Sequence, residues 1–497
     1  MVKLREMLMP RHRAAEHLVQ VHRLPIRITG DPQRVTMRFF WPGVERSRHI
    51  VQRLTTLSSD RVRQQVDEIF RRFEPRHEDL EDILTQNAQE TASRLQMDLD
   101  GDALRQLLLG ACMSMEYSIE AAALFNPSMV QALDQSGLMP GQIRFLMSMR
   151  AVGEGHLSSI VFRRGTISDD GEFQLAPPAR QARQVRQVPN PEYRKVNLER
   201  KLRDMQKLHE GTQAVLDALG DVFNYQQLLA VLDRLQAERV VPNIESVHQL
   251  LVWMVKSNYK AQVSPDAPIN EYVLFPVSEA ESHGMEDMRL VQFVEEDGQV
   301  TLYGTYTAFS GNKILPQMMI YHPANNQMQM VTLLGRYAHG KGLALFPRKI
   351  NGQYMMLGRC DGESNYLLRS DQVDFWGRGT LLAGPQAAWE VVQVGNCGSP
   401  IETPQGWLAL THGVGPLRRY CIGAMLLDLD DPARVIARLD SPLIEPQEEE
   451  SSGYVPNVVY SCGGMLHGDK LFIPYGISDT ACGFAWVSLD ELLHAME

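Results

Sequence analysis

The sequence predicts a mainly β protein with α-helical additions, and three observations lead to this prediction. From residue 271 to the end, short strand-like runs alternate with Asn-Gly, Asp-Gly and Gly-Asp turns, as at 351–352, 361–362 and 468–469. These runs recur in groups of about 40 to 50 residues, which is the size of a propeller blade. Helical periodicity is confined to two regions, 45–110 and 198–260. We therefore expect a β-propeller with helical parts, and a β-sandwich is the main structural alternative.

Length and composition exclude several classes of protein. A chain of 497 residues is too long for one ordinary core and predicts two or three structural units. Hydrophobic content of 44% and charged content of 22% are typical of a soluble globular protein. A net charge of −11 argues against nucleic acid as the main partner. No stretch approaches the roughly 20 apolar residues that span a bilayer, so no membrane partner is expected.

The first residues and the cysteines indicate a cytoplasmic protein. Residues 1–6 lack an apolar signal core. The six cysteines form no Cys-x-x-Cys pair, so we expect reduced thiols and no zinc site.

Taken in order, the chain divides into four expected parts. A mostly helical domain covers 1–110, a first blade covers 111–175, a linker and helical insertion cover 176–265, and the remaining blades cover 266–497. In the first part, a strand is expected over 34–40, and apolar residues then recur at three- and four-residue spacing with Ser59-Asp60 as a helix cap. Its arginines alternate with acidic residues, which favours a solvated face or a subunit contact over RNA binding.

The first blade is expected as strand, polar loop, strand. The loop carries Arg150, Glu154 and His156 within seven residues. Although Gly153 and Gly155 flank Glu154, no Lys-Ser/Thr follows and no helix begins, so this is not a phosphate loop.

The segment 282–289, Ser-His-Gly-Met-Glu-Asp-Met-Arg, precedes a predicted β-hairpin that turns at Asp297-Gly298. We expect the segment to be a loop entering a strand, where a sheet can direct side chains into a cleft. Taken by itself, the segment favours solvated surface charges. Further along, two strands that follow turns end in the single basic residues Arg359 and His412, and a third ends near Asp479. One polar residue at the inner end of successive blades is what a site in a central channel requires.

The second half of the chain resembles the inverting β-mannoside phosphorylases of glycoside hydrolase family 130. The resemblance rests on stretches in the order and spacing of that family, namely 284–289, 306–308, 341–352, 370–376, 407–414, 420–432, 453–457 and 475–479. Residues 121–165 look like the family's first blade. The resemblance implies a five-bladed propeller with its site in the central cavity.

Residue roles follow from the resemblance position by position. Asp287 matches the family's general acid, although the proline that usually follows it is Met288 here. The positions that match the phosphate-binding set are Arg150, Lys341, Arg359 and His412. The positions that match substrate-binding segments are Arg289, Asp479, Tyr475, Asn126 and Ser128. Relatives that hydrolyse their substrate carry carboxylates around the same pocket, so the intact basic set favours phosphorolysis.

The resemblance therefore predicts an enzyme that cleaves β-1,2- or β-1,4-linked manno-oligosaccharides with inorganic phosphate and gives α-mannose 1-phosphate. Phosphate is the nucleophile, so one proton donor suffices, and we expect no metal and no organic cofactor. One alternative is an inverting β-mannosidase with Glu154 or Glu363 as its base, and another is a non-catalytic glycan-binding propeller. Tyr303 and Tyr306 could stack on a sugar, but aromatic residues in strands are more often core. The helical regions are expected to mediate a homo-oligomer or to wall off the acceptor side.

Overall fold

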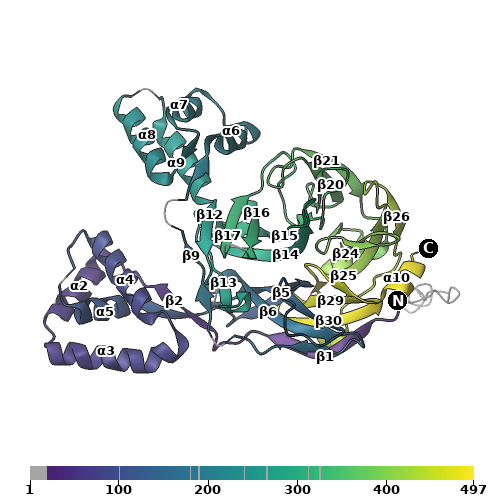
Figure 1. Ribbon diagram of the computed structural model, residues 1–497, viewed down its shortest axis with the longest axis horizontal. Helices are drawn as coiled ribbons and strands as arrows, with labels where there is room; N and C mark the ends of the chain where they lie inside the picture. The colour runs from purple at the N-terminus through teal and green to yellow at the C-terminus, as the bar shows by residue number, and fades with distance from the viewer. Residues whose placement is uncertain are drawn as a thin grey trace, which may run out of the picture.

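The computed structural model describes residues 19–99, 101–179, 181–188, 191–239, 241–264, 267–311, 313–323 and 326–496. The interpretation of residues 1–6 therefore lies outside the described residues. Figure 1 shows a ring of β-sheets with two separate groups of helices on one side of it. Among the described residues, no helix is both long enough and apolar enough to cross a membrane.

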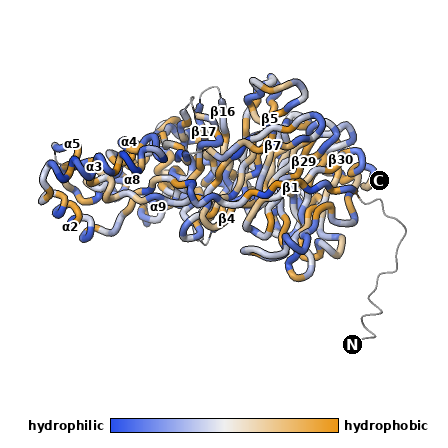
Figure 2. The backbone as a smooth tube through the Cα atoms, turned by 90° about the horizontal axis from the view of Figure 1, so that it is seen from below, coloured by the Kyte–Doolittle hydropathy of each residue, from blue (hydrophilic) through white to orange (hydrophobic). Residues whose placement is uncertain are grey.

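The first helical group is connected to the rest of the protein by a two-stranded ribbon. The ribbon pairs β2 (Val35–Phe39) with β3 (Ser114–Ser118). Between these strands come the helices α2 (Val44–Thr55), α3 (Ser59–Phe73), α4 (Leu80–Leu95) and α5 (Ala103–Cys112), with η1 (Glu74–Arg76) after α3. The side chain that caps α3 belongs to Ser58, one residue before the predicted cap. Figure 2 shows hydrophilic stretches along α3 and α4, as expected for helices that bury one face.

Two helices of this group pack in backbone contact at a glycine. A Cβ atom on Gly110 of α5 would lie 1.8 Å from the carbonyl oxygen of Leu84 in α4. Only glycine permits this approach, so replacing Gly110 would push the two helices apart.

The strands outside the helical groups form mostly antiparallel sets of four to six strands, arranged around a common centre (Figure 1). The first set contains β4 (Ala123–Gln131), β5 (Gln142–Val152), β6 (Ser158–Ser168), β7 (Phe173–Leu175), β8 (Arg183–Gln184) and β13 (Tyr272–Leu274). The second contains β14 (Gly284–Val294), β15 (Val300–Phe309), β16 (Ile314–His322), β17 (Gln327–Thr332), β12 (Tyr259–Gln262) and β9 (Arg186–Gln187). A parallel pair between Gly284 and Ser158 joins these two sets. The predicted hairpin at Asp297-Gly298 is confirmed by the pairing of β14 with β15.

Three further sets complete the ring. The third contains β18 (Ala344–Leu345), β19 (Tyr354–Gly358), β20 (Asn365–Ser370) and β21 (Arg378–Ala383). The fourth contains β22 (Gln393–Asn396), β23 (Ile401–Thr403), β24 (Gly406–Val414), β25 (Tyr420–Leu427) and β26 (Val435–Arg438). The fifth contains β27 (Val459–Tyr460), β28 (Met465–His467), β29 (Lys470–Ile477), β30 (Ala481–Ser488) and β1 (His22–Thr29), with α10 (Leu489–His494) after it.

The strand β1 changes the expected division of the chain. It lies within the part predicted as a helical domain over 1–110, yet it pairs with β30 near the C-terminus. The last sheet is thus built from both ends of the chain, and the helices begin only at Val44. The reason is that pairing with β30 covers a sheet edge that would otherwise present unpaired backbone groups.

The second helical group lies between the first and second sets of strands in the sequence. It comprises α6 (Lys195–Asp204), α7 (Glu210–Ala218), α8 (Tyr225–Ala237) and α9 (Ile244–Lys256), with the short strands β10 (Tyr193–Arg194) and β11 (Val222–Phe223). Its buried leucines and valines form a core of their own. The helical periodicity predicted over 198–260 is therefore confirmed.

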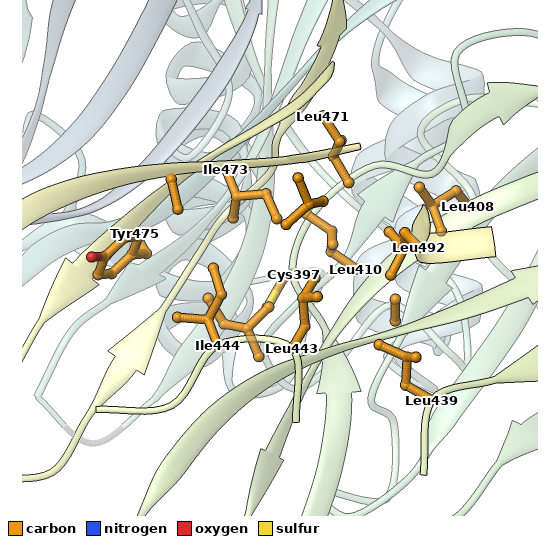
Figure 3. Close-up of a cluster of buried hydrophobic side chains, with 14 of the residues drawn as sticks. Cys397, Leu408, Leu410, Leu439, Leu443, Ile444, Leu471, Ile473, Tyr475 and Leu492 are labelled. Atoms are coloured by element: carbon orange, nitrogen blue, oxygen red, sulfur yellow. The ribbon is translucent and has the colours of Figure 1, made fainter. Parts of the chain in front are cut away.

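The hydrophobic core lies between neighbouring sheets. Figure 3 shows the cluster between the fourth and fifth sets, in which Leu408 and Leu410 of β24 meet Ile473 and Tyr475 of β29. Packing of this kind fixes the sheets against each other, and loops at the strand ends can then be placed accurately.

Candidate active site

Asp287 lies inside a strand, not in the loop expected before it. It is the fourth residue of β14, at an irregularity where the pairing with β15 shifts between Glu286 and Arg289. Its φ of 53° is in the left-handed region, which non-glycine residues seldom adopt. A bulge of this type redirects side chains, which is a common device beside active sites.

A second bulge faces the first. Asn126 of β4 has a φ of 50°, and the pairing of β4 with β5 shifts between Phe125 and Ser128. The Asn126 amide Nδ2 donates to Asp287 Oδ1 at 2.8 Å. Two irregular strands from different sets therefore meet at the Asp287 carboxylate.

Glu286 links the cations around Asp287, and the sequence analysis did not single it out. Arg150 donates through Nη2 to Glu286 Oε1 at 2.9 Å, and Lys341 donates through Nζ to Glu286 Oε2 at 2.6 Å. Arg150 Nη1 also lies 3.6 Å from Asp287 Oδ1. In a regular strand, neighbouring side chains point to opposite faces, and the bulge is what lets both carboxylates face Arg150. The only signal in the sequence was the position of Glu286 beside Asp287.

The charges set the proton affinity of Asp287. Burial raises the pKa of this carboxyl group, whereas the charges of Arg150 and Lys341 lower it. The Asn126 amide and the Arg289 charge act in the same direction, so the pKa lies below its ordinary value.

Asp479 shows the opposite shift. It occupies the turn between β29 and β30 and also has a left-handed φ, of 50°. Burial, and then the negative charge of Asp287, raise the pKa of Asp479 to about 6, while Arg150 opposes the shift. Two neighbouring carboxyl groups whose pKa values are driven apart are typical of sites that handle protons.

Arg289 is buried and hydrogen-bonds to the backbone at Asp287. Its Nη1 donates to the Asp287 carbonyl oxygen at 3.0 Å, and its Nη2 donates to the Tyr460 hydroxyl at 2.6 Å. The guanidinium is bonded to the backbone of the bulge, which fixes the position of the carboxylate above it.

Arg359 and His412 form an adjacent pair in which only the arginine carries charge. Arg359 Nη1 donates to His412 Nε2 at 3.0 Å, and His412 Nδ1 lies 3.3 Å from the Asn396 carbonyl oxygen. An arginine cannot accept a hydrogen bond, so Nε2 is the acceptor and Nδ1 carries the proton. Burial, followed by the Arg359 and Arg289 charges, lowers the pKa of His412 well below its usual range. The low pKa favours a neutral His412 that orients Arg359 by accepting its hydrogen bond, and the role of His412 in binding phosphate stays a prediction.

Two predicted substrate-binding residues are buried away from any ligand. The Ser128 hydroxyl accepts from the Leu290 amide at 3.0 Å, and the Ser128 side chain is completely buried. The Tyr475 hydroxyl donates to Glu450 Oε1 at 2.8 Å, and its ring belongs to the core in Figure 3. Ser128 joins β4 to β14, and Tyr475 joins β29 to η8 (Glu448–Glu450), so both hydroxyl groups are used within the protein.

The remaining candidates also lie outside the cluster. Tyr303 is buried among apolar side chains, and the buried Tyr306 hydroxyl donates to Glu281 Oε1 at 2.8 Å. Glu154 and Glu363, the bases considered for a hydrolase, are both exposed. The acidic side chain in contact with the cations is Glu286 instead.

Unsatisfied polar atoms surround the cluster. Of the buried side-chain atoms that lack a hydrogen-bond partner among the described residues, these belong to or border the cluster: Asn126 Oδ1, Arg289 Nε, Arg359 Nε and Asn396 Oδ1. Buried polar atoms of proteins are normally paired, so such a group indicates a place for a polar ligand. Donors and acceptors in this mixture suit a sugar with many hydroxyl groups together with an anion. A carboxyl group beside two cations is what an enzyme requires if it cleaves a glycosidic bond with an anion.

Comparisons with known proteins agree with this class. The family model for glycoside hydrolase family 130, described as beta-1,4-mannooligosaccharide phosphorylase, matches residues 266–497. A 1,2-beta-oligomannan phosphorylase of Thermoanaerobacter sp. (strain X514) is 33% identical over 227 residues, which are 45% of this chain and 75% of that protein. A beta-1,2-mannobiose phosphorylase of Listeria innocua serovar 6a is 31% identical over 231 residues, 45% of this chain and 63% of that protein.

The solved structure of a beta-1,2-mannobiose phosphorylase from Listeria innocua, in complex with beta-1,2-mannobiose, aligns with a TM-score of 0.46 and 21% identity over 76% of this chain and 93% of that one. From the family model and the sequence relatives, the chain belongs to glycoside hydrolase family 130, a family of mannoside phosphorylases.

Proposed function

We propose that this chain is an inverting phosphorylase that cleaves β-mannosides and releases α-mannose 1-phosphate and a shortened acceptor. A phosphate oxygen forms a bond to C1 of the mannosyl unit on the face opposite the leaving oxygen, while the C1–O bond to the acceptor breaks. Asp287 supplies the proton that the leaving oxygen gains. This chemistry requires no metal and no organic cofactor, so the activity is expected to survive a chelator.

The observation that carries the proposal is the pair of cations beside Asp287. Phosphate binds where several cationic donors converge. Arg150 and Lys341 converge on the carboxylate of Glu286, the neighbour of Asp287, at 2.9 and 2.6 Å. A hydrolase would instead require a free carboxylate to activate water. Both oxygens of Glu286 are engaged by cations, which leaves it a poor base and favours phosphate as the nucleophile.

The charges also suggest how the acid acquires its proton. A general acid must be protonated, yet the neighbouring cations keep the pKa of Asp287 below its ordinary value in the free enzyme. Phosphate between Arg150 and Lys341 offsets these charges and adds negative charge near Asp287. Both effects raise the pKa of the carboxyl group, so phosphate binding prepares the acid.

The fold and assembly complete the proposal. The ring of strand sets in Figure 1 supports a five-bladed β-propeller, and β14, which carries Asp287, belongs to the second set. The two helical groups project from the ring and are proposed to mediate self-association, which light scattering tests. The six unpaired cysteines fit a reducing compartment, so the proposed location is the cytoplasm.

A product assay tests the function and names the linkage. The purified chain is incubated with β-1,2- or β-1,4-mannobiose, with and without inorganic phosphate, and mannose 1-phosphate and mannose are measured separately. Phosphate-dependent mannose 1-phosphate is the expected product. Free mannose at a rate that does not depend on phosphate would show a hydrolase, and binding without turnover would show a glycan-binding protein.

A further inference from the structure

Two exposed aromatic rings from distant parts of the chain stack on each other. His156 ends the short turn η2 (Glu154–His156) between β5 and β6, and Tyr454 lies in the segment 451–458 before β27. The ring centroids are 5.8 Å apart and the ring planes differ by 27°. Tyr454 is 70% exposed, so the stack covers only part of the ring. An open aromatic face therefore remains available to a ligand.

The backbone beneath Tyr454 is held firmly although its ring is exposed. The Tyr454 amide donates to Thr480 Oγ1 at 3.0 Å, and the Val455 amide donates to the Ser478 carbonyl oxygen at 3.1 Å. A Cβ atom on Gly453 would lie 2.5 Å from that same carbonyl oxygen, so only glycine allows this close contact. Ring burial does not explain the arrangement, whereas presentation of the ring to a ligand does.

The stack is tied at both ends to the catalytic cluster. Thr480 directly follows Asp479, whose pKa responds to the Asp287 charge. On the other side, His156 belongs to the turn that joins Arg150 in β5 to Ser158 in β6, and Arg150 Nε donates to Ser158 Oγ at 2.9 Å. His156 is thus a few residues from Arg150, which contacts the proposed acid, and Tyr454 is hydrogen-bonded to the residue that follows Asp479.

A third loop, between β24 and β25, lies beside the Tyr454 segment. The Tyr420 amide donates to the Asn457 carbonyl oxygen at 3.0 Å, which brings η7 (Pro416–Arg418) next to the Tyr454 segment. Arg418 lies close enough to Asp479 to lower its pKa, although burial of Asp479 dominates that pKa. Leu417 at the tip is 96% exposed and has a φ of 59°. Strained backbone in loops is typical of binding sites.

We propose that the His156–Tyr454 pair is the platform on which the acceptor sugar of the β-mannoside stacks, with the Pro416–Arg418 loop at its side. The inference rests on the proposed function, and it adds the residues that select the acceptor. A pyranose ring has a face of C–H groups that packs on an aromatic ring, while its hydroxyl groups stay in water or reach polar neighbours. Because the platform stands at the edge of the site, it contacts the leaving sugar and not the mannosyl unit being transferred.

Acceptor kinetics in the synthetic direction test the platform. With mannose 1-phosphate as donor, the Tyr454→Ala variant is expected to raise the KM for the acceptor roughly 5- to 10-fold, while Tyr454→Phe keeps the wild-type value because the ring is retained. The KM for phosphate in the degradative direction is expected to stay unchanged. Leu381→Ala, which removes another exposed apolar side chain (61% exposed) from β21, is the matched control.

The failure of the platform and the failure of the proposed function give different results. An active Tyr454→Ala enzyme with an unchanged acceptor KM would overturn the platform and leave the phosphorylase intact. A wild-type chain without phosphate-dependent turnover would overturn the function, and calorimetric titration with β-1,2- and β-1,4-mannotriose then tests the platform directly. Equal affinities of wild type and Tyr454→Ala in that titration would refute it, and weaker binding by Tyr454→Ala would support it.

Discussion

Replacing Glu286 by glutamine tests whether this carboxylate positions the phosphate-binding cations. The substitution keeps the shape of the side chain and removes its charge. Lys341 lies between Gly340 and Gly342, which have φ values of 77° and 91°, and its hydrogen bond to Glu286 is what orients its ammonium group. Glutamine offers one acceptor oxygen where glutamate offers two, so we expect either Lys341 or Arg150 to lose its acceptor and the remaining bond to lose the charge of the carboxylate.

The magnitude follows from the burial of each pair. The Arg150–Glu286 pair is mostly buried, with 20% and 8% of the side chains exposed, so a charge-assisted bond there contributes about 1.5 to 3 kcal/mol. The Lys341 side chain is 39% exposed, and its pair with Glu286 is screened and contributes less than about 1 kcal/mol. A loss of about 2 kcal/mol in phosphate binding corresponds to a roughly 30-fold fall in kcat/KM for phosphate.

The assay is steady-state phosphorolysis. Phosphate is varied at saturating mannoside in one series, and the mannoside is varied at saturating phosphate in a second series. The KM for phosphate is expected to rise much more than the KM for the mannoside, which a general loss of structure would not produce. Glu402→Gln is the matched control. Glu402 lies on β23 and forms an exposed ion pair with Arg348, so its replacement should leave both KM values unchanged. In a Lys341→Met background, Glu286→Gln should have a smaller further effect, since part of the interaction is already lost.

An unchanged or lower KM for phosphate in Glu286→Gln would refute the reasoning. It would mean that Glu286 competes with phosphate for the cations and does not position them.

Four other outcomes are expected. Asp287→Asn should reduce turnover at least about 100-fold while mannoside binding, measured by calorimetry, survives; normal turnover would exclude Asp287 as the acid. Phosphate binding should be accompanied by proton uptake, measured by calorimetry in buffers of different ionisation enthalpy. Because the Asp287 pKa is low in the free enzyme and rises in the complex, phosphate affinity should increase as pH falls through the pKa of the complex toward that of the free enzyme, and a pH-independent affinity would contradict the coupling. His412→Gln should weaken phosphate binding through Arg359, but should not remove an inflection near pH 6.5, where an ordinary histidine titrates, because burial and the Arg359 and Arg289 charges lower the pKa of His412 well below that value; a lost inflection there would show a charged histidine. Glu120→Gln should lower the free energy of unfolding by about 3 to 5 kcal/mol, since buried Glu120 contacts Arg34 at 2.5 Å and Arg163 at 2.8 Å; a denaturation midpoint like that of wild type would refute this.

The sequence alone determined the fold class, the two helical regions and most of the residues around Asp287. Periodicity and turn chemistry are local properties, and they are readable without coordinates. The hairpin at Asp297-Gly298 and the helices between Lys195 and Lys256 were predicted for this reason. Family resemblance then supplied Asp287, Arg150 and Lys341, because their order along the chain matches a known pattern.

The tertiary structure decided which side chains face the site. Ser128 and Tyr475 match the pattern in sequence, yet their hydroxyl groups are hydrogen-bonded within the protein, Ser128 to the Leu290 amide and Tyr475 to Glu450. Glu286 became visible only because a bulge turns two successive carboxylates toward one arginine, against the alternation that a strand normally imposes. The charge of His412 depends on burial and on Arg359, which lies 53 residues away in the chain. Long-range pairing, such as β1 with β30, and the electrostatics of burial arise from contacts between distant segments, and no local pattern encodes them.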